Sequence, residues 1–352
     1  MTDWLALDYR PHIPATGLGI GMIGCGGIAG VAASAYRAAG LRVTAVCDVN
    51  RAAATRFRDE YFPTALVFDD HRDLLDSPGV DVVDIATHTA VRAPLIRDAL
   101  TAGKHVQSQK PFVFDLAEGE QLCDLADRNG VVLTVNQNAR WSPHFAYLLA
   151  AARSGALGAI ASADFELHWD HDSAVVGTPF ATMDDLVLLD FGIHWFDLVS
   201  ALMGGRRAQS VYALTTSSSD QVVTVPTLAG ALIDFGDAQA SLLFRASSRN
   251  GEEGRYRVDG SLAAVLSDGP ALGGDHVTVL VDGEQAIVPV MGQWMPDGLG
   301  GTMGELLAAI AEGRTPTTSA RTVLEGLRLC FAALESARTR REVRPGDVTG
   351  AN

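Results

Sequence analysis

Three titratable side chains lie at helical spacing in the stretch Leu188–Met203. Asp190 and His194 are four residues apart and Asp197 follows three residues later, so a helix here places all three on one face. An imidazole titrates near neutral pH and can move a proton in catalysis. The surrounding residues are apolar, and a buried histidine beside a carboxylate is also a common structural contact. The spacing alone leaves both interpretations open.

A glycine-rich turn follows the first β-rich run. The residues Gly24-Cys25-Gly26-Gly27-Ile28-Ala29 lie between the apolar run Leu18–Ile23 and a helical stretch over Gly30–Ala39. In a strand–turn–helix context this pattern binds the pyrophosphate of a dinucleotide. Gly24 permits the tight turn, Gly26 lets the backbone approach the phosphates, and the helix N-terminus supplies N–H groups and positive dipole density. A glycine cluster alone also fits an ordinary turn.

An acid at the end of the second strand sharpens this prediction. The run Arg42–Cys47 leads into Asp48, close to the spacing of roughly 20 residues expected of the acid that binds the adenosine ribose. Its carboxylate accepts hydrogen bonds from the ribose hydroxyls and repels a 2′-phosphate. Arg51 softens that discrimination, and capping of the next helix is the alternative role for Asp48. We therefore expect NAD, with NADP still possible.

The hydrophobic pattern divides the chain into two regions. Brief β-rich runs alternate with helical stretches up to about Asn138, which predicts a parallel sheet with crossover helices. From Trp141 onward, long alternating runs indicate antiparallel strands with one solvated face. We predict an α/β protein with a doubly wound parallel sheet in residues 1–140 and an α+β domain on an open, mainly antiparallel sheet in residues 141–352. The strand candidates are Leu18–Ile23, Arg42–Cys47, Ala65–Phe68, Val82–Ala86, His105–Gln109, Val131–Asn136, Ala159–Trp169, Ser210–Ser217, Val222–Phe235 and Gln239–Ala246.

Composition excludes several classes of protein. The chain has 352 residues and a formal charge of −15, which disfavours nucleic acid and anionic membrane surfaces as partners. The N-terminus lacks the pattern of a signal peptide, and no run of about 18 apolar residues follows. We expect a soluble, cytoplasmic protein. The four cysteines stand singly, which predicts neither a disulfide framework nor a zinc site.

Several further motifs follow one another in a fixed order. They are Gly103-Lys104-His105-Val106, Gln109-Lys110-Pro111, Asn138-Ala139-Arg140-Trp141 and Asp190-Phe191-Gly192-Ile193-His194. From Gly19 to about Arg340 the chain resembles the glucose-fructose oxidoreductase and inositol dehydrogenase family, Gfo/Idh/MocA. The resemblance implies an N-terminal Rossmann domain, NAD(P)-dependent redox chemistry on a sugar or polyol, and homodimers or homotetramers packed through the C-terminal sheet.

The resemblance also implies roles for individual residues. His194 acts as the general base, Asp190 orients the hydroxyl or the imidazole, and Lys110 favours the developing alkoxide. Without the resemblance, Lys110 is an ordinary loop lysine. No metal is implied. Cofactor contacts are implied for Gly24, Gly26, Gly27, Ile28, Asp48, Arg51, Thr87, His88, Gln109, Lys110 and Asn138, and substrate contacts for Lys110, Arg140, Trp141, His168, Asp190 and His194.

Two residues depart from the family pattern. Gln109 stands where the family commonly has Glu, which removes a charge beside Lys110. Arg92 stands where many relatives have His, which alters what the pocket admits. The cluster His168-Trp169-Asp170-His171-Asp172 suggests a metal site, but on a strand its two histidines point to opposite faces, so substrate contact or a solvated loop fits better. Trp141, Trp169 and Trp294 are sugar-stacking candidates or core residues.

Three functions remain to be distinguished. The first is an NAD-dependent dehydrogenase that oxidises a secondary hydroxyl of a sugar, inositol or related polyol. The second uses NAD transiently during glycoside cleavage and forms product without net NADH. The third is a regulator that binds NAD without catalysis, against which the intact Lys110, Asp190 and His194 argue.

Overall fold

The computed structural model describes residues 3–270 and 272–351. The chain forms two compact units that are interleaved along the sequence. The parallel-sheet unit comprises Pro11–Trp141 and Met295–Leu324, and the mixed-sheet unit comprises the chain up to Arg10, Ser142–Trp294 and the chain from Glu325 onward. This division differs from the predicted boundary between residues 140 and 141, because Met295–Leu324 belongs to the parallel-sheet unit.

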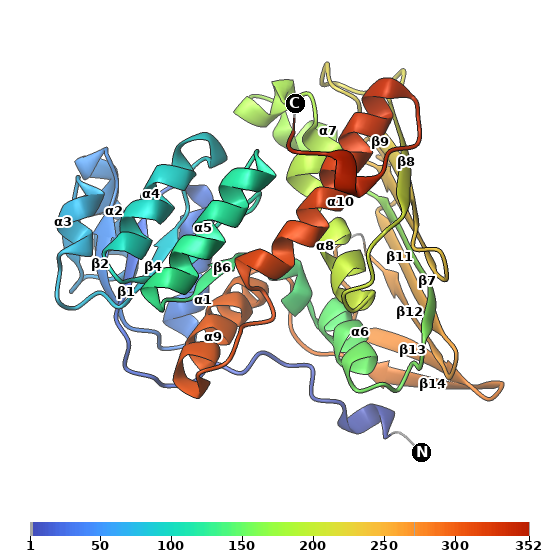
Figure 1. Ribbon diagram of the computed structural model, residues 1–352, viewed down its shortest axis with the longest axis horizontal. Coiled ribbons are helices and arrows are strands. Elements are labelled where there is room, and N and C mark those ends of the chain that lie inside the picture. The colour runs from blue at the N-terminus through green and yellow to red at the C-terminus, as the bar shows by residue number, and fades with distance from the viewer. Residues whose placement is uncertain (1–2, 271, 352) are drawn as a thin grey trace. The chain divides into compact units, whose positions relative to one another are not determined.

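The parallel-sheet unit contains six parallel strands in the order β3-β2-β1-β4-β5-β6 (Figure 1). The order reverses between β1 and β4, as in a doubly wound Rossmann sheet, so the predicted fold is confirmed. The predicted runs contain all six strands, although each strand is shorter than its run. The strands are β1 (Ile20–Ile23), β2 (Val43–Cys47), β3 (Leu66–Phe68), β4 (Val82–Ile85), β5 (His105–Ser108) and β6 (Leu133–Val135).

Crossover helices, α1 (Gly27–Ala38) among them, connect these strands. One further helix of this unit comes from late in the sequence. The helix α9 (Asp297–Glu312) packs against α1, and its Leu299, Met303 and Leu306 share one apolar core with Tyr36 of α1. Glycines allow other close approaches, since a Cβ at Gly301 would lie 2.7 Å from Cγ of Trp141. The crossover helices are α2 (Arg51–Tyr61), α3 (His71–Leu75), α4 (Thr89–Thr101) and α5 (Leu116–Asn129).

A buried polar network crosses the middle of this sheet. The hydroxyl of Tyr36 donates to Oδ2 of Asp84 at 2.7 Å and accepts a hydrogen bond from Nε2 of Gln107 at 2.9 Å. All three side chains are at most 2% exposed. Burial raises the pKa of Asp84 to about 6 because desolvation penalises the carboxylate more than its hydrogen bonds stabilise it. The core of this unit therefore contains a carboxyl group whose ionisation lowers the stability of the folded protein as pH rises.

The mixed-sheet unit contains an eight-stranded sheet in the order β14-β13-β12-β11-β7-β10-β9-β8. Only β7 and β10 pair in parallel, and the other neighbours are antiparallel, as predicted. Its strands are β7 (Ile160–His168), β8 (Ser210–Thr216), β9 (Leu228–Asp234), β10 (Gln239–Arg245), β11 (Glu253–Gly260), β12 (Ala264–Gly269), β13 (His276–Val281) and β14 (Glu284–Pro289).

One predicted strand is too long. The run Val222–Phe235 was expected to be extended throughout, but β9 begins only at Leu228. Pro226 lacks the N–H that a sheet needs. Nε2 of Gln221 instead donates to the carbonyl oxygens of Val223 and Val225 at 2.8 Å. The segment before Leu228 is therefore a loop closed by a side chain.

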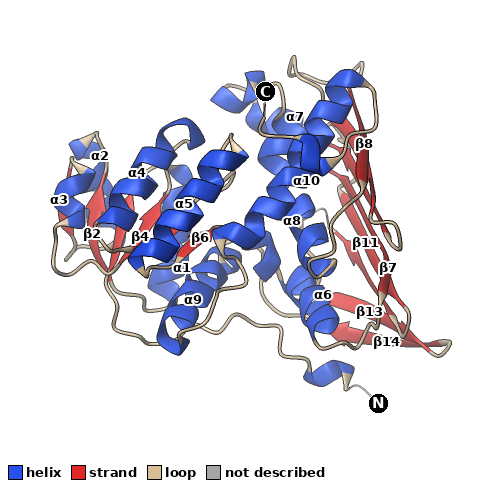
Figure 2. Ribbon diagram, in the orientation of Figure 1, coloured by secondary structure: helices blue, strands red, loops and turns tan. Residues whose placement is uncertain are grey.

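Helices cover one face of the eight-stranded sheet and leave the other open (Figure 2). The helices α6 (Pro143–Arg153) and α8 (Ile193–Leu202) contact each other, and α8 contacts β7. On β7 the inward residues, such as Phe165 and Leu167, are buried, while Asp164 and Glu166 point outward. Further along the chain, α10 (Ala320–Thr339) contacts the sheet through Ser336, whose Oγ accepts a hydrogen bond from the Ala213 amide at 2.8 Å. Among the described residues, no helix is long and apolar enough to cross a membrane.

We predict that Asp84→Asn stabilises the protein above about pH 6. The wild-type carboxyl binds a proton more tightly when folded, so its contribution to stability is present below about pH 4 and is lost as pH rises through about 6. The asparagine keeps an acceptor for Tyr36 and removes this loss, which the pKa shift puts on the order of 2–3 kcal/mol. Urea unfolding from pH 4.5 to 8 measures it. Asp76→Asn, at an exposed acid of the same unit, should show no such pH-dependent difference, and parallel curves for wild type and Asp84→Asn contradict the prediction.

Candidate active site

The predicted cofactor residues follow strand ends at one edge of the six-stranded sheet. Gly24 follows β1, Asp48 follows β2, Thr87 comes soon after β4 and Gln109 follows β5. Because all six strands are parallel, their carboxyl ends meet at the same edge, and ligands of doubly wound sheets bind there. The structure thus gathers residues that are far apart in sequence.

The glycine-rich turn leaves open space where phosphates would bind. Gly24 has a φ of +93°, and a Cβ there would lie 2.9 Å from the carbonyl oxygen of Ala86, so a side chain is excluded. Gly26 is the N-cap of α1, without a side-chain cap, and Ile28 lies in its first turn. Side-chain carbons added at Gly26 or Gly27 would meet no atom within 4 Å. The first amides of a helix have no intrahelical acceptor, so this turn fits a pyrophosphate.

Asp48 is held at this turn by backbone amides. Its Oδ2 accepts from the amide of Cys25 and its Oδ1 from the amide of Asn50, each at 2.9 Å. The alternative capping role is wrong, because Asn50 is the N-cap of α2 and accepts from the Ala53 amide. Burial, with Asp48 as a lesser cause, raises the pKa of Cys25 to about 12, so the thiol adds no charge to the turn. Asp48 is left as a fixed carboxylate beside the phosphate site.

Arg51, which was expected to weaken the preference for NAD over NADP, has an acidic partner. Its Nη1 lies 3.4 Å from Oδ2 of Asp69, and both side chains are exposed. An exposed pair of this kind is weak and can rearrange. Two acids, Asp48 and Asp69, therefore stand near the end of the second and third strands, where only one was predicted.

The loops after β4 and β5 carry the remaining residues on the nicotinamide side. His88 is the N-cap of α4 and is exposed, while Oγ1 of Thr87 is buried with no hydrogen-bond partner in the described part of the chain. Oε1 of Gln109 accepts from the amide of Lys110 at 2.8 Å. Gln109 therefore fixes the main chain at Lys110 even without the charge of a glutamate. The orphaned hydroxyl and the open glycine turn both fit a bound dinucleotide.

The segment after β6 is tied to the late part of the same unit. Asn138, Ala139, Arg140 and Trp141 form a short 3-10 helix. Asn138 and Arg140 are buried, and Nη1 of Arg140 donates to the carbonyl oxygen of Thr317 at 2.6 Å. Trp141 packs against α9, where Gly301 makes room for it. Arg140 and Trp141 thus have clear structural contacts in addition to any contact with a ligand.

The helix that carries the candidate base is not regular, and the prediction of one continuous α-helix over Leu188–Met203 is wrong. Leu186–Phe191 is a π-helix, and α8 begins at Ile193. The π turn contains Asp190, which is half-buried, so the α-helical spacing to His194 does not hold. Gly192 lies at the junction, where a Cβ would be 2.7 Å from the carbonyl oxygen of Leu188.

His194 lies in the first turn of α8 and is 4% exposed. Its ring meets the ring of Trp294 edge to face, with centroids 5.4 Å apart and an interplanar angle of 83°. Trp294 in turn meets Trp195 at 5.7 Å. Asp197, on the following turn, is buried against Gly326, where a Cβ would lie 2.7 Å from its Cα. The imidazole is therefore packed edge to face against the Trp294 ring.

The structure does not bring His168 together with His194. His168 is on the outward face of β7, and its Nε2 pairs with Oε1 of Glu166 at 2.9 Å. The helix α8 with His194 packs on the inward face. His168, predicted as a substrate contact, therefore does not lie with the candidate base. In the described ranges, no three His, Cys, Asp or Glu side chains are grouped to hold a metal ion.

The tryptophan of the cluster His168–Asp172 is part of the inner core. Trp169 is 5% exposed and stacks on Phe191, with centroids 4.3 Å apart and planes tilted by 27°. Just after it, the buried carboxylate of Asp172 binds Nη2 of Arg249 at 2.9 Å. These contacts hold the segment between β7 and the π-helix. Its conformation could not be predicted from sequence patterns.

Two contributions were missed in the sequence. Trp294 was considered as a sugar-stacking or core residue but not as a contact of the candidate base. The buried acid Asp84 went unnoticed, although an acid inside the apolar run Val82–Ile85 is a signal of a polar network. Arg92 was noticed only as a departure from the family pattern, although it is a buried cation with main-chain contacts.

Comparison with protein families identifies the chain. Residues 18–137 match the family described as "Oxidoreductase family, NAD-binding Rossmann fold", and residues 145–266 match the "GFO/IDH/MocA C-terminal domain". The chain belongs to the Gfo/Idh/MocA oxidoreductase family. One Gfo/Idh/MocA profile matches within each of the two regions seen in the sequence, so the resemblance is confirmed.

Curated relatives match at low identity. D-apiose dehydrogenase of Paraburkholderia graminis is 27% identical over 92% of this chain and 88% of its own. Inositol 2-dehydrogenase of Burkholderia multivorans is 26% identical over 90% of this chain and 92% of its own. Other matches are shorter: this chain spans about half the length of the oxidoreductase YrbE of Bacillus subtilis, with 27% identity over 49% of each chain.

Solved structures share the fold. An oxidoreductase from Agrobacterium radiobacter in complex with NAD+, L-tartaric acid and magnesium has a TM-score of 0.83 at 22% identity, covering 94% of this chain and 99% of that chain. Levoglucosan dehydrogenase in complex with NADH and levoglucosan has a TM-score of 0.78 at 21% identity, covering 93% and 99%. At these identities the likeness establishes the architecture alone.

Proposed function

We propose that this protein is an NAD-dependent dehydrogenase that oxidises a secondary hydroxyl of a sugar, inositol or related polyol. The observation that carries the proposal is the convergence of the glycine turn, Asp48, Thr87 and the Gln109–Lys110 pair at one edge of the parallel sheet. D-apiose, inositol and levoglucosan dehydrogenases among its relatives support a polyhydroxylated substrate.

The preference for NAD over NADP rests on charge. Asp48 is fixed by two amides beside the turn that fits the pyrophosphate, so it is positioned to accept from the ribose hydroxyls. A 2′-phosphate would meet this carboxylate and the neighbouring Asp69. Arg51, the one nearby cation in our prediction, already pairs with Asp69. The balance of charge therefore disfavours the additional phosphate.

The family resemblance implies which side chains carry out the proposed chemistry. Bound NAD+ supplies the acceptor for a hydride. His194 removes the hydroxyl proton as the carbon is oxidised, and Trp294 fixes the orientation of its ring. The ammonium of Lys110 stabilises negative charge that develops on the same oxygen. Asp190, in the π turn just before α8, orients the hydroxyl or the imidazole.

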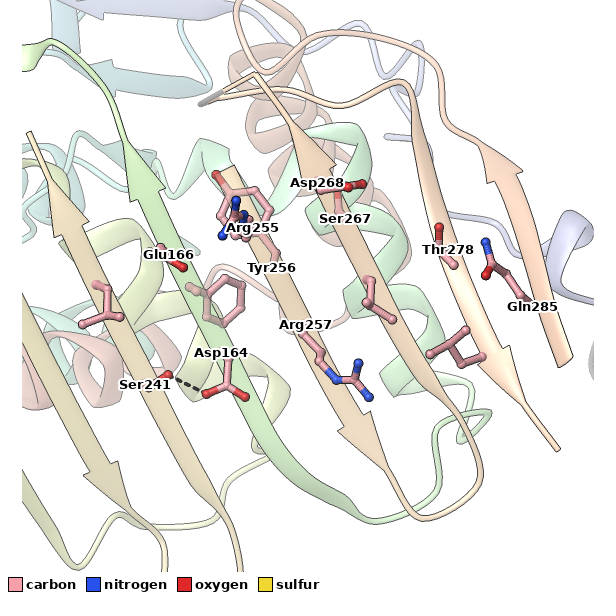
Figure 3. A pocket seen from close by; sticks show the side chains of 14 residues that line it. Asp164, Glu166, Ser241, Arg255, Tyr256, Arg257, Ser267, Asp268, Thr278 and Gln285 are labelled. Atoms are coloured by element: carbon pink, nitrogen blue, oxygen red, sulfur yellow. Dashed lines mark hydrogen bonds between the residues drawn. The ribbon is translucent and has the colours of Figure 1, made fainter. Parts of the chain in front are cut away.

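We further propose that two copies of the chain pack through the outward face of the eight-stranded sheet. Figure 3 shows Asp164 and Glu166 of β7 beside Arg255 and Arg257 of β11 on this face. A twofold interface places one surface against itself, so charges of both signs on the same patch can pair across it. The apolar side chains Tyr212, Leu214, Leu232 and Leu243 of β8, β9 and β10 add exposed area that a second copy would bury.

We predict that His194→Ala abolishes turnover and leaves NADH binding intact. The measurement is NADH formation at 340 nm with a panel of aldoses, inositols and sugar acids, together with NADH fluorescence titration. Removal of a general base should lower kcat about 10²- to 10⁴-fold. His12→Ala, at an exposed histidine outside the candidate site, is the control and should retain activity. Full activity of His194→Ala would show that another group is the base.

The same panel separates the alternative functions. Net NADH from a wild-type reaction supports the dehydrogenase. Consumption of a glycoside without net NADH supports transient redox in glycoside cleavage, and NADH binding without turnover of any compound supports a regulator.

We predict that Asp48→Asn relaxes the preference for NAD. The amide keeps an acceptor for the Cys25 amide but loses the charge, and one unit charge about 4 Å from a phosphate is worth about 4 kcal/mol at an effective dielectric constant of 20. The ratio of kcat/KM for NAD+ to that for NADP+ should fall at least about tenfold. The control is Asp59→Asn, at an exposed acid of α2. An unchanged ratio rules out a discriminating role for Asp48.

We predict that Leu232→Asp produces monomers. A charge on β9 of the outward face should prevent association, because a buried unpaired carboxylate is costly. Sedimentation equilibrium of wild type and variant gives the result. Leu66→Asp, at an exposed position of β3 in the parallel-sheet unit, should leave the mass unchanged. A monomeric wild type, or a dimeric Leu232→Asp, would reject the proposed interface.

A further inference from the structure

Arg92 is a buried cation that binds main-chain oxygen atoms. It lies in the first turns of α4 and is 2% exposed. Its Nε and Nη2 donate to the carbonyl oxygen of Thr87 at 3.1 and 2.5 Å, and its Nη1 donates to the carbonyl oxygens of Gln109 and Pro111. The guanidinium therefore joins the loop after β4 to the loop after β5.

The carbonyl groups it binds lie on both sides of Lys110. Gln109 precedes the lysine and Pro111 follows it, while Oε1 of Gln109 accepts from the lysine's own amide. Thr89 adds a weaker contact, since its Oγ1 donates to the carbonyl oxygen of Pro111 at 3.3 Å. The main chain at Lys110 is thus bound by the Arg92 and Thr89 side chains of α4 and by the side chain of Gln109.

A guanidinium is suited to this task. It presents its N–H donors in a rigid planar fork, whereas an ammonium is a compact charge that cannot span oxygen atoms on two loops. Burial lowers the pKa of Arg92 to about 9, with Asp84 as an opposing influence, so the side chain stays charged at neutral pH. A desolvated cation is costly, and the carbonyl oxygens are what stabilises this one.

We propose that Arg92 is a positioning residue that fixes the loop of Lys110 against the loop of Thr87 and so sets where the lysine side chain acts. Being buried, Arg92 works through the backbone and does not itself reach the substrate. The inference rests on the proposed function for the catalytic role of Lys110. The tie between the two loops can be tested without turnover.

The experiment compares Arg92→Ala and Arg92→Lys with Arg97→Ala, an exposed arginine of the same helix. Amide hydrogen exchange is measured for peptides covering residues 108–114 and, as an internal reference, residues 20–23. Steady-state kinetics give kcat and the KM for NAD+. Both measurements on Arg92→Ala are repeated with millimolar guanidinium and with methylammonium, a cation that lacks the fork.

We expect local loosening with a loss of rate. In Arg92→Ala, exchange over 108–114 should accelerate about tenfold or more while the reference peptide is unchanged. The kcat should fall about 100-fold, as expected for a displaced catalytic group, with the KM for NAD+ changed less than about threefold. Guanidinium should restore protection and part of kcat, and methylammonium should not. For Arg92→Lys, the exchange rate over 108–114 and kcat should lie between those of wild type and Arg92→Ala. Both should be unchanged in Arg97→Ala.

The failures can be told apart. Unchanged exchange over 108–114, no rescue by guanidinium, or exchange that accelerates equally in the reference peptide each overturn the positioning role. If Arg92→Ala does not fold, a wild-type exchange pattern in Arg92→Lys overturns it equally. If wild type oxidises no polyol, the proposed function fails, and guanidinium-dependent protection of 108–114 still decides whether Arg92 ties the loops.

Discussion

Parallel pairing of β1 with β2 and β4 is the interaction on which the nucleotide-binding half of this protein depends. The register Ile23–Cys47 and Ile23–Ile85 brings three strand ends level with one another. Because of it the amide of Gly24 donates to the carbonyl oxygen of Cys47 at 2.8 Å, and Asp48 reaches the amide of Cys25. A shift of one residue would separate the turn from its acid. The phosphate site is therefore a product of strand register.

The parallel sheet also explains why polar groups are buried in this unit. Strands that lie between two layers of helices have no solvated face, so Asp84, Gln107 and Tyr36 must satisfy one another. The loops beyond the strand ends have no sheet partners, and a guanidinium from α4 supplies donors to their carbonyl groups. Rigidity at the site thus depends on side chains that bind the backbone.

Sequence patterns predicted what depends on local periodicity. The six parallel strands and the glycine turn follow from short apolar runs separated by glycines, and the family profiles confirm the family resemblance. What the patterns missed depends on distant contacts. The return of α9 to α1 joins residues far apart in sequence, and the π turn of Leu186–Phe191 has the same apolar composition as an α-helix. The short loop before β9 depends on the single side chain of Gln221.

The candidate site shows the same division. Asp48 and the glycine turn could be placed from spacing, since both belong to a single βαβ unit. The contact of Trp294 with His194 could not, because it joins residues separated by most of the mixed-sheet unit. His168 and His194 have similar chemistry in the sequence, and only the sheet, with one residue on each side of β7, distinguishes them.

The central claim is that this chain transfers hydride from a polyol carbon to NAD+. The most direct measurement uses a substrate that carries deuterium at each carbinol carbon, with the NADH isolated and examined by mass spectrometry and proton NMR. The account predicts one deuterium per NADH, at C4 of the nicotinamide ring. NADH that carries no deuterium, or the absence of NADH with every deuterated polyol, would contradict it.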